Sequence, residues 1–280
     1  MKSPRQTPLS LADLRRDIDR IDADMHALLI ERGEIIERLI AVKKTEESGS
    51  AFRPAREADM MRRLVQRHHG SLPLETVESI WRVIISTFTY VQAPFAAHAD
   101  LSAGDALMRD TARFHFGFTV PLVPHAGAAN VVQAVTASKG DLGLVPAFAT
   151  PGAGPWWTAL EFETSPKIIA RLPFVERRDH PAGLPVFVIS RAAADAMVTE
   201  TEVWSVRVAG WKATSIEALA GATDAIAVPD RAFDGAALLV SVPAGGMDAV
   251  ADALIRGGAS IRARALVGSH ATRYTVPQSP

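Results

Sequence analysis

A repeating pattern of apolar residues between positions 11 and 44 constrains the fold more than any other feature of the chain. The apolar residues recur at alternating steps of three and four, at Leu11, Leu14, Ile18, Ile21, Met25, Leu28, Ile35, Leu39 and Val42. This spacing places them along one side of a helix that packs lengthwise on other helices. We predict one long helix from Leu11 to Lys44, and we call this row of residues the apolar seam.

One position of the apolar seam holds a charged residue. The step after Leu28 falls on Arg32, whose guanidinium is costly to bury without an acidic partner or an anionic ligand. Arg15 and Lys43 lie at the edge of the same seam. Taken singly, these cations also fit structural roles, as a registry residue or as solvated flanking charges.

The spacing of the three cations indicates how they could share a ligand. At 1.5 Å rise per residue, Arg32 and Lys43 are roughly 16 Å apart along the helix, within joint reach of one small molecule. Arg15 is about 26 Å from Arg32, which is too far for the same small molecule. If Arg15 serves that site, it must come from a second chain, so the spacing suggests a dimer with shared sites.

Two further helices are predicted after the first. Pro54 begins a short helix that ends by Gly70, and Pro73 opens a third. Gln92 interrupts the apolar stripe of the third helix, and a buried amide must find hydrogen-bond partners. The stripe consists of Val77, Ile80, Trp81, Ile84, Ile85, Phe88, Val91 and Phe95. A long, a short and a long helix do not form a complete bundle alone, which favours pairing with another chain.

Composition narrows the class of protein. The chain has 280 residues, 48% hydrophobic and 22% charged, which is typical of a soluble globular protein of two domains. The net charge of -1 argues against a nucleic-acid-binding surface. There are no cysteines, and His68 and His69 have no partner at metal spacing, so we predict no metal. The first dozen residues lack a signal peptide and no apolar run reaches a membrane span, so we expect a cytoplasmic protein.

Several of these residues together resemble the all-helical class of chorismate mutases, over roughly residues 9 to 95. The resemblance implies a domain over residues 1–97 that is an all-α, three-helix, long-short-long intertwined homodimer. It also implies conversion of chorismate to prephenate without a cofactor. The matching motifs are Leu14-Arg15, Ile18, Asp22, Leu28-Leu29 with Glu31-Arg32, Lys43, Pro54-Ala55-Arg56-Glu57 and Gln92.

The same resemblance implies a role for each polar residue. Arg32 binds one substrate carboxylate, and Arg15 of the partner chain binds the other. Lys43 and Gln92 donate hydrogen bonds to the ether oxygen, so Lys43, Gln92 and Arg32 are the expected catalytic residues. Glu57 meets the ring hydroxyl. A Claisen-type rearrangement agrees with such a set, because it needs a folded dianion and stabilised charge on the breaking ether oxygen.

Three more positions complete the comparison with that family. Arg56 is expected as a further cation lining the substrate pocket. Arg53 stands where many members carry an aspartate, and Phe88 stands where a small hydroxyl residue usually helps to hold a carboxylate. Arg53 adds positive charge beside a dianion, which is compatible with activity, whereas Phe88 removes a hydrogen bond, so we expect an activity that survives in weakened form.

Residues 98–280 read as an α/β domain, because predicted helices and strands alternate. We expect a linker at 96–104 before it. The predicted helices are 105–113, 131–138 and 247–256, and the predicted strands are 114–123, 142–145, 167–172, 185–189, 237–242, 260–267 and 273–276.

Two segments of this domain resemble other enzymes of the same pathway. Residues 139–146 are similar to the segment that leads into a strand in prephenate dehydratases. In that family the next residues are Ile-Glu-Asn-Ser, whereas this chain has Ala147-Phe148-Ala149-Thr150. The family's Thr-Arg-Phe signature is also missing, so we expect a degenerate dehydratase. The glycine loop at 243–246, between a predicted strand and a predicted helix, resembles a loop of regulatory domains that bind amino acids. This resemblance implies an aromatic amino-acid effector. The same glycines also fit an ordinary turn with no ligand.

Three other functions remain open from the residues. Isochorismate pyruvate-lyase uses the same helical fold, although Glu57 argues against it because the two substrates carry their hydroxyl on different ring carbons. A bifunctional mutase and prephenate dehydratase is disfavoured by the missing motifs. A non-catalytic helical dimerisation module with a small-molecule-sensing lobe is kept open by Arg53 and Phe88.

Overall fold

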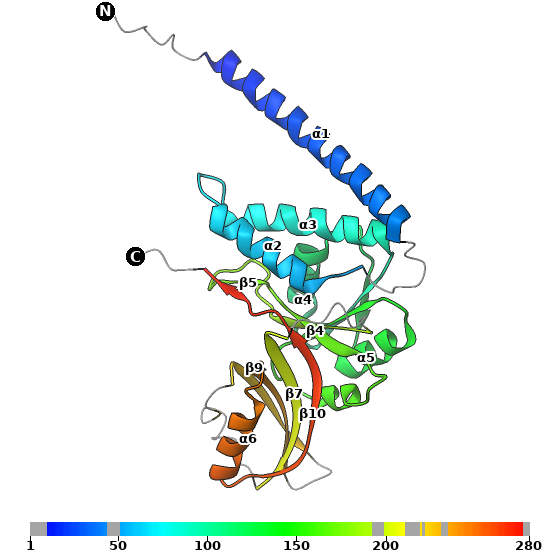
Figure 1. The fold of residues 1–280 in the computed structure, drawn as a ribbon, viewed down its shortest axis with the longest axis vertical. Coiled ribbons are helices and arrows are strands. Elements are labelled where there is room, and N and C mark those ends of the chain that lie inside the picture. The colour runs from blue at the N-terminus through cyan, green and yellow to red at the C-terminus, as the bar shows by residue number, and fades with distance from the viewer. Residues whose placement is uncertain are drawn as a thin grey trace, which may run out of the picture. The chain divides into compact units, whose positions relative to one another are not determined.

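The computed structural model describes residues 10–43, 51–191, 199–210, 219, 222–230 and 235–276 (Figure 1). The chain divides into two compact units, residues 1–47 and residues 48–280, and each is described by itself. The order of elements confirms the predicted fold class, with helices up to residue 92 and an α/β region after them. The domain boundary expected at residue 97 stays a prediction.

The first unit contains α1, a single helix over Leu11–Lys43. Its start is fixed by reciprocal hydrogen bonds: the Asp13 amide donates to Ser10 Oγ at 3.1 Å, and the Ser10 amide donates to Asp13 Oδ2 at 3.2 Å. This is a capping box, in which the cap residue and the residue three positions later each satisfy the other's backbone amide. The hydrogen bonds from Ser10 lower the pKa of the Asp13 carboxyl.

The apolar seam of α1 is exposed to solvent along most of its length. Leu28 is 63% exposed, and Ile21, Met25 and Ile35 are each about half exposed. The apolar stripe therefore runs along one side of α1, as the spacing of its residues predicts.

In the second unit, α2 over Pro54–Arg67 and α3 over Leu74–Gln92 pack against each other. The buried face of α2 includes Ala58, Met61 and Leu64. The predicted apolar stripe of α3 was wrong in part. Ile80 is 39% exposed and Val91 is 52% exposed, whereas the buried residues are Val77, Glu78, Arg82, Ile85, Ser86 and Thr89.

The reason is the packing partner of α3. The polar side of α3 faces α4, over Asp105–Phe116, which belongs to the α/β region. One hydrophobic core therefore contains Met61 and Ile85 of the helices together with Met108 and Phe116 of α4. The helices α2 and α3 and the α/β region share this core.

The α/β region opens with three parallel strands. These are β1 over Ala97–Asp100, β2 over Leu122–His125 and β3 over Leu142–Pro146, with β1 between the other two. The helix α5 over Ala128–Ala137 connects β2 to β3. Two antiparallel pairings extend the sheet, from β3 to β6 over Val186–Ser190 and from β6 to β4 over Lys167–Leu172.

Two predictions in this region were wrong. The expected linker at 96–104 contains the buried strand β1 and a short 3-10 helix over Leu101–Ala103. The expected strand at 114–123 is the end of α4, a turn, and only the start of β2. The aromatic side chain of Phe116 is buried from the last turn of α4, and Gly117, with φ 65°, ends that helix.

The remaining strands form an antiparallel unit that we call the C-terminal sheet. It contains β7 over Thr201–Ala209, β8 over Asp224–Asp230, β9 over Gly235–Pro243 and β10 over Ser260–His270, in the order β10-β7-β9-β8. The helix α6 over Met247–Arg256 packs on one face of it (Figure 1).

The C-terminal sheet joins the first sheet where β10 meets β4. The contact is close at Gly268, where a Cβ would lie 2.1 Å from the carbonyl oxygen of Ile168, so only glycine fits. Among the described residues the result is a nine-stranded sheet, β2-β1-β3-β6-β4-β10-β7-β9-β8. A separate pair joins β5 over Val175–Glu176 to β11 over Tyr274–Thr275, and a second 3-10 helix spans Trp156–Leu160.

Candidate functional site

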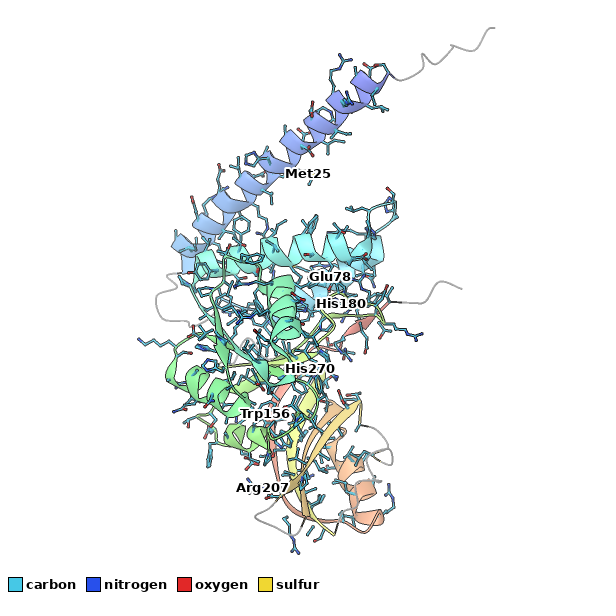
Figure 2. All side chains as sticks on the ribbon, turned by 180° about the vertical axis from the view of Figure 1, so that it is seen from behind. Met25, Glu78, Trp156, His180, Arg207 and His270 are labelled. Carbon is cyan, nitrogen blue, oxygen red and sulfur yellow. The ribbon has the colours of Figure 1, made fainter. Side chains whose placement is uncertain are left out.

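The helix α1 carries three of the predicted site residues. Arg15 is exposed, Arg32 is half-buried, and Lys43 is the last residue of the helix. The side chain of Lys43 lies outside the described residues. Because α1 is continuous, the axial spacing assumed for these cations holds. Figure 2 shows α1 with its side chains, including Met25 of the apolar seam.

The other three predicted residues lie on α2 and α3. Arg56 is exposed in the first turn of α2. Gln92 ends α3, and its Nε2 donates to the carbonyl oxygen of Phe88 at 3.0 Å. Glu57 is buried. Within this described part of the chain, no hydrogen bond or ion pair joins two of these three residues to each other.

Glu57 forms a buried ion pair that the sequence did not suggest. Arg82 Nη1 of α3 donates to Glu57 Oε2 at 2.6 Å, and the two side chains are 1% and 5% exposed. Arg82 Nη2 also donates to the carbonyl oxygen of His115 on α4 at 3.1 Å, and its guanidinium lies over the ring of Phe174. Arg82 thus connects α2, α3 and the α/β region.

Opposing effects act on the Glu57 carboxyl. Burial raises its pKa, because a charged carboxylate is costly to desolvate, while Arg82 and the nearby Arg56 lower it. The net pKa is raised. His115, which is also buried, has its pKa lowered well below the usual value, first by burial and then by the positive charge of Arg82.

A second buried contact lies beside this pair. His180 Nε2 and Glu78 Oε1 of α3 are 3.1 Å apart, and Figure 2 shows the two labelled side chains side by side. The amide of Ala182 donates to His180 Nδ1 at 3.1 Å, so Nδ1 carries no proton and Nε2 is the donor to Glu78. The hydrogen bond from Ala182 fixes the tautomer of His180. The contact with Glu78 connects α3 to the segment that follows β5.

No pattern in the sequence identifies Arg82 as a functional residue. Arg82 lies on one side of α3 with Glu78, Ser86 and Thr89, which is typical of a solvent-facing surface. The contacts of these residues show that this side is buried. Arg82 contacts Glu57, 25 residues away, and Glu78 contacts His180, 102 residues away.

The helices α1, α2 and α3 precede the α/β region in the chain and carry all six of the predicted site residues. Residues 14–93 match the family model described as chorismate mutase type II. All six predicted substrate-binding residues lie inside this matched segment.

Curated relatives resemble more of the chain than this segment. A bifunctional chorismate mutase/prephenate dehydratase from Pseudomonas aeruginosa is 31% identical over 140 residues, 49% of this chain and 38% of that protein. One from Neisseria gonorrhoeae is 33% identical over 103 residues, 37% of this chain and 27% of that protein. The chain therefore matches less than half the length of these relatives. The resemblance seen in the sequence, to helical mutases and to dehydratases behind them, is confirmed.

Solved structures give weaker matches. A structure entitled "GqqA- a novel type of quorum quenching acylases" is 15% identical with a TM-score of 0.42, over 64% of this chain and 95% of that chain. A prephenate dehydratase from Streptococcus mutans is 11% identical with a TM-score of 0.36, over 63% and 97%. At these scores neither structure adds to the assignment of the fold.

Across the described part of the chain, no helix is long and apolar enough to cross a bilayer.

Proposed function

We propose that this chain is a chorismate mutase, an isomerase that converts chorismate to prephenate in aromatic amino-acid biosynthesis. The observation that carries the proposal is the family match over residues 14–93, which includes Arg15, Arg32, Lys43, Arg56, Glu57 and Gln92. The dehydratase-like region behind it is proposed to be degenerate. We place the protein in the cytoplasm.

The proposed chemistry requires positioning and charge stabilisation. Arg32 and the partner chain's Arg15 bind the two carboxylates of chorismate and hold it in the compact conformer that reacts. Lys43 and Gln92 donate hydrogen bonds to the ether oxygen, where negative charge develops as the C–O bond breaks. Losing one such donor costs about 3 to 4 kcal/mol of barrier at comparable oxyanion sites.

Glu57 is proposed to accept a hydrogen bond from the ring hydroxyl. Its contact with Arg82 is compatible with this role, because two carboxylate oxygens accept about four hydrogen bonds in total. Arg56, exposed at the start of α2, is proposed as the further cation of the pocket.

We propose an intertwined homodimer in which the apolar seam of α1 is buried against the partner chain. Leu28→Glu should then convert the dimer to a monomer, since burying an unpaired charge costs several kcal/mol. Ala27→Glu, one position off the seam, should leave the dimer intact. Light scattering measures both masses, and a dimer of unchanged mass in Leu28→Glu would reject this interface.

Phe88→Ser is expected to increase kcat/KM. A hydroxyl at this position of α3 adds a hydrogen bond to a substrate carboxylate. One hydrogen bond to a charged group changes a binding constant about tenfold, and we expect kcat/KM to rise by a similar factor. Phe88→Ala removes the ring without adding a donor and serves as the control. Equal kcat/KM values for the two variants would show that the hydroxyl has no partner in the substrate.

The proposed function is tested by incubating the full chain with chorismate and separating the products by chromatography. Prephenate as the sole product supports the mutase and a degenerate dehydratase region. Phenylpyruvate as well would show that the α/β region has the prephenate dehydratase activity for which the bifunctional relatives are named. No turnover of chorismate would contradict the proposal; release of pyruvate from isochorismate would then identify the lyase, and inertness toward both would leave the dimerisation module.

The C-terminal sheet with α6 is proposed to bind an aromatic amino-acid effector. A shift in KM for chorismate on adding phenylalanine or tyrosine would support this role, and identical kinetics with and without both amino acids would contradict it.

A further inference from the structure

Three guanidinium groups line one cavity of the second unit. The cavity has a volume of about 180 Å³, and Arg177, Arg178 and Arg273 line it together with Glu176 and His180. Arg177 and Arg178 directly follow β5, and Arg273 directly precedes β11, the strand that pairs with β5. This pairing brings cations from distant parts of the sequence to one cavity.

The acidic groups around the cavity neutralise these cations only in part. Among the described residues, Glu176 is the one carboxylate on the wall of this cavity, and its Oε1 is 2.7 Å from Arg273 Nη2. Arg178 is exposed and makes no hydrogen bond or ion pair within the described residues. His180 donates from Nε2 to Glu78, in the tautomer given above, and in that neutral form it adds no charge.

Arg177 has hydrogen-bonding capacity that the chain does not use. Its side chain is 11% exposed and its Nη1 donates to Glu75 Oε2 at 3.3 Å. Its Nη2 is 3.6 Å from Glu78 Oε2, beyond a hydrogen bond, and both Nε and Nη2 are buried without an acceptor among the described residues. Leaving such N–H groups unsatisfied costs free energy, so an acceptor that reached Nε or Nη2 would be stabilising.

Arg273 pairs with Glu176 and lies near a further cation, Arg171. Burial, followed by the positive charge of nearby Arg171, lowers its pKa, while Glu176 and Asp224 oppose this. An additional anion beside Arg273 would relieve the repulsion from Arg171.

A larger cavity adjoins the first. Its volume is about 500 Å³, and it shares Glu176, Arg177 and Arg178 with the smaller one. Leu74 of α3 and Val276, which follows β11, form its apolar wall, and Asp179 adds a second carboxylate to the two arginines and Glu176. A molecule with one anionic end and a short apolar body would match the two cavities together.

We propose that the two adjoining cavities bind a small organic acid, with its carboxylate between Arg177, Arg178 and Arg273 and its apolar part toward Leu74 and Val276. The planar guanidinium fork matches the two oxygens of a carboxylate, which makes arginine the suited residue for this group. None of the six residues proposed to bind chorismate lines either cavity, so this site is independent of the mutase proposal.

The experiment titrates hexanoate into the full chain by calorimetry, with 1-hexanol as the neutral matched probe and inorganic phosphate as the second anion. Hexanoate should bind one site per chain and raise Tm, because a ligand that binds only the folded state stabilises it. Hexanol should not bind. Tighter binding of phosphate than of hexanoate, or equal binding of hexanol, would overturn the assignment to a carboxylic acid.

Substitutions of two cavity arginines test where hexanoate binds. Arg178→Gln and Arg273→Gln should each weaken hexanoate binding about tenfold, the loss expected for one charge-assisted hydrogen bond. Arg256→Gln, at an exposed position of α6, should bind like the parent. Since the Arg178 side chain is exposed, its variant keeps the fold even if Arg273→Gln does not. Undiminished binding in Arg178→Gln, or no binding by the parent chain, would overturn the proposal.

Discussion

Replacing Arg82 with methionine is expected to lower the free energy of unfolding by about 3 to 5 kcal/mol near neutral pH, the cost of leaving a buried charge without its partner. The Arg82 and Glu57 side chains are almost fully buried and 2.6 Å apart, so water cannot replace the lost guanidinium. The variant also loses the hydrogen bond to the His115 carbonyl oxygen. Urea denaturation measures the change.

Two controls separate the charge from the loss of packing. Arg63→Met removes an exposed arginine of α2 that pairs with Asp59, and it should cost no more than about 1 kcal/mol. The double variant Glu57→Gln/Arg82→Met leaves no unpaired charge and should recover much of the lost stability. A double variant as unstable as Arg82→Met alone would show that packing, and not the ion pair, is responsible.

The same variant should acquire a pH dependence. The folded-state pKa of Glu57 is raised by burial, and removing Arg82 raises it further because Arg82 opposes that shift. A raised carboxyl pKa contributes stability below the unfolded value of 4.5, and this contribution is lost as pH rises through the folded pKa. The free energy of unfolding of Arg82→Met should therefore be closest to that of the parent at acidic pH, and the difference should grow as pH rises. The double variant should lack this pH dependence.

Arg32→Met is expected to reduce kcat/KM for chorismate about 100- to 1,000-fold, the effect of removing one donor to a charged group at comparable sites. Methionine fits the apolar seam of α1, so helicity and dimer mass should be unchanged. Arg15→Met should produce a loss of similar size, because each arginine is assigned one of the two substrate carboxylates. Steady-state assays of prephenate formation measure both.

Arg38→Met is the matched control on the same helix. Arg38 is exposed and its Nε donates to the Glu34 carbonyl oxygen of its own helix, so its removal should leave kcat/KM unchanged. Activity retained in Arg32→Met, with a dimer of unaltered mass, would assign Arg32 a purely structural role.

The helices α1, α2 and α3 could be predicted closely because their signals are local. The three-and-four spacing of the seam, the Ser10 and Asp13 cap, and the prolines at 54 and 73 all act within a few residues. The strand β1 could not be predicted, because Ala-His-Ala-Asp is short and only its pairing with β2 and β3 buries it.

Part of the candidate site, like part of the fold, could be predicted from the sequence, and part could not. The positions of Arg15, Arg32 and Lys43 on one helix follow from their spacing, and their assignment to substrate groups follows from the family resemblance. The contact of Glu57 with Arg82 follows from neither, since it depends on α4 packing over the polar side of α3. Sequence periodicity describes one helix at a time and does not say which neighbour covers a polar face.

We propose that two chains share each mutase site, and a hybrid dimer distinguishes shared sites from sites within one chain. Arg15→Met and Arg32→Met chains, each inactive alone, are co-expressed with different tags and the mixed dimer is purified. By two-fold symmetry one of its two sites contains both arginines, so prephenate should form from chorismate at about half the parent rate. A mixed dimer as inactive as the two variants would show that Arg15 and Arg32 of different chains do not form a common site.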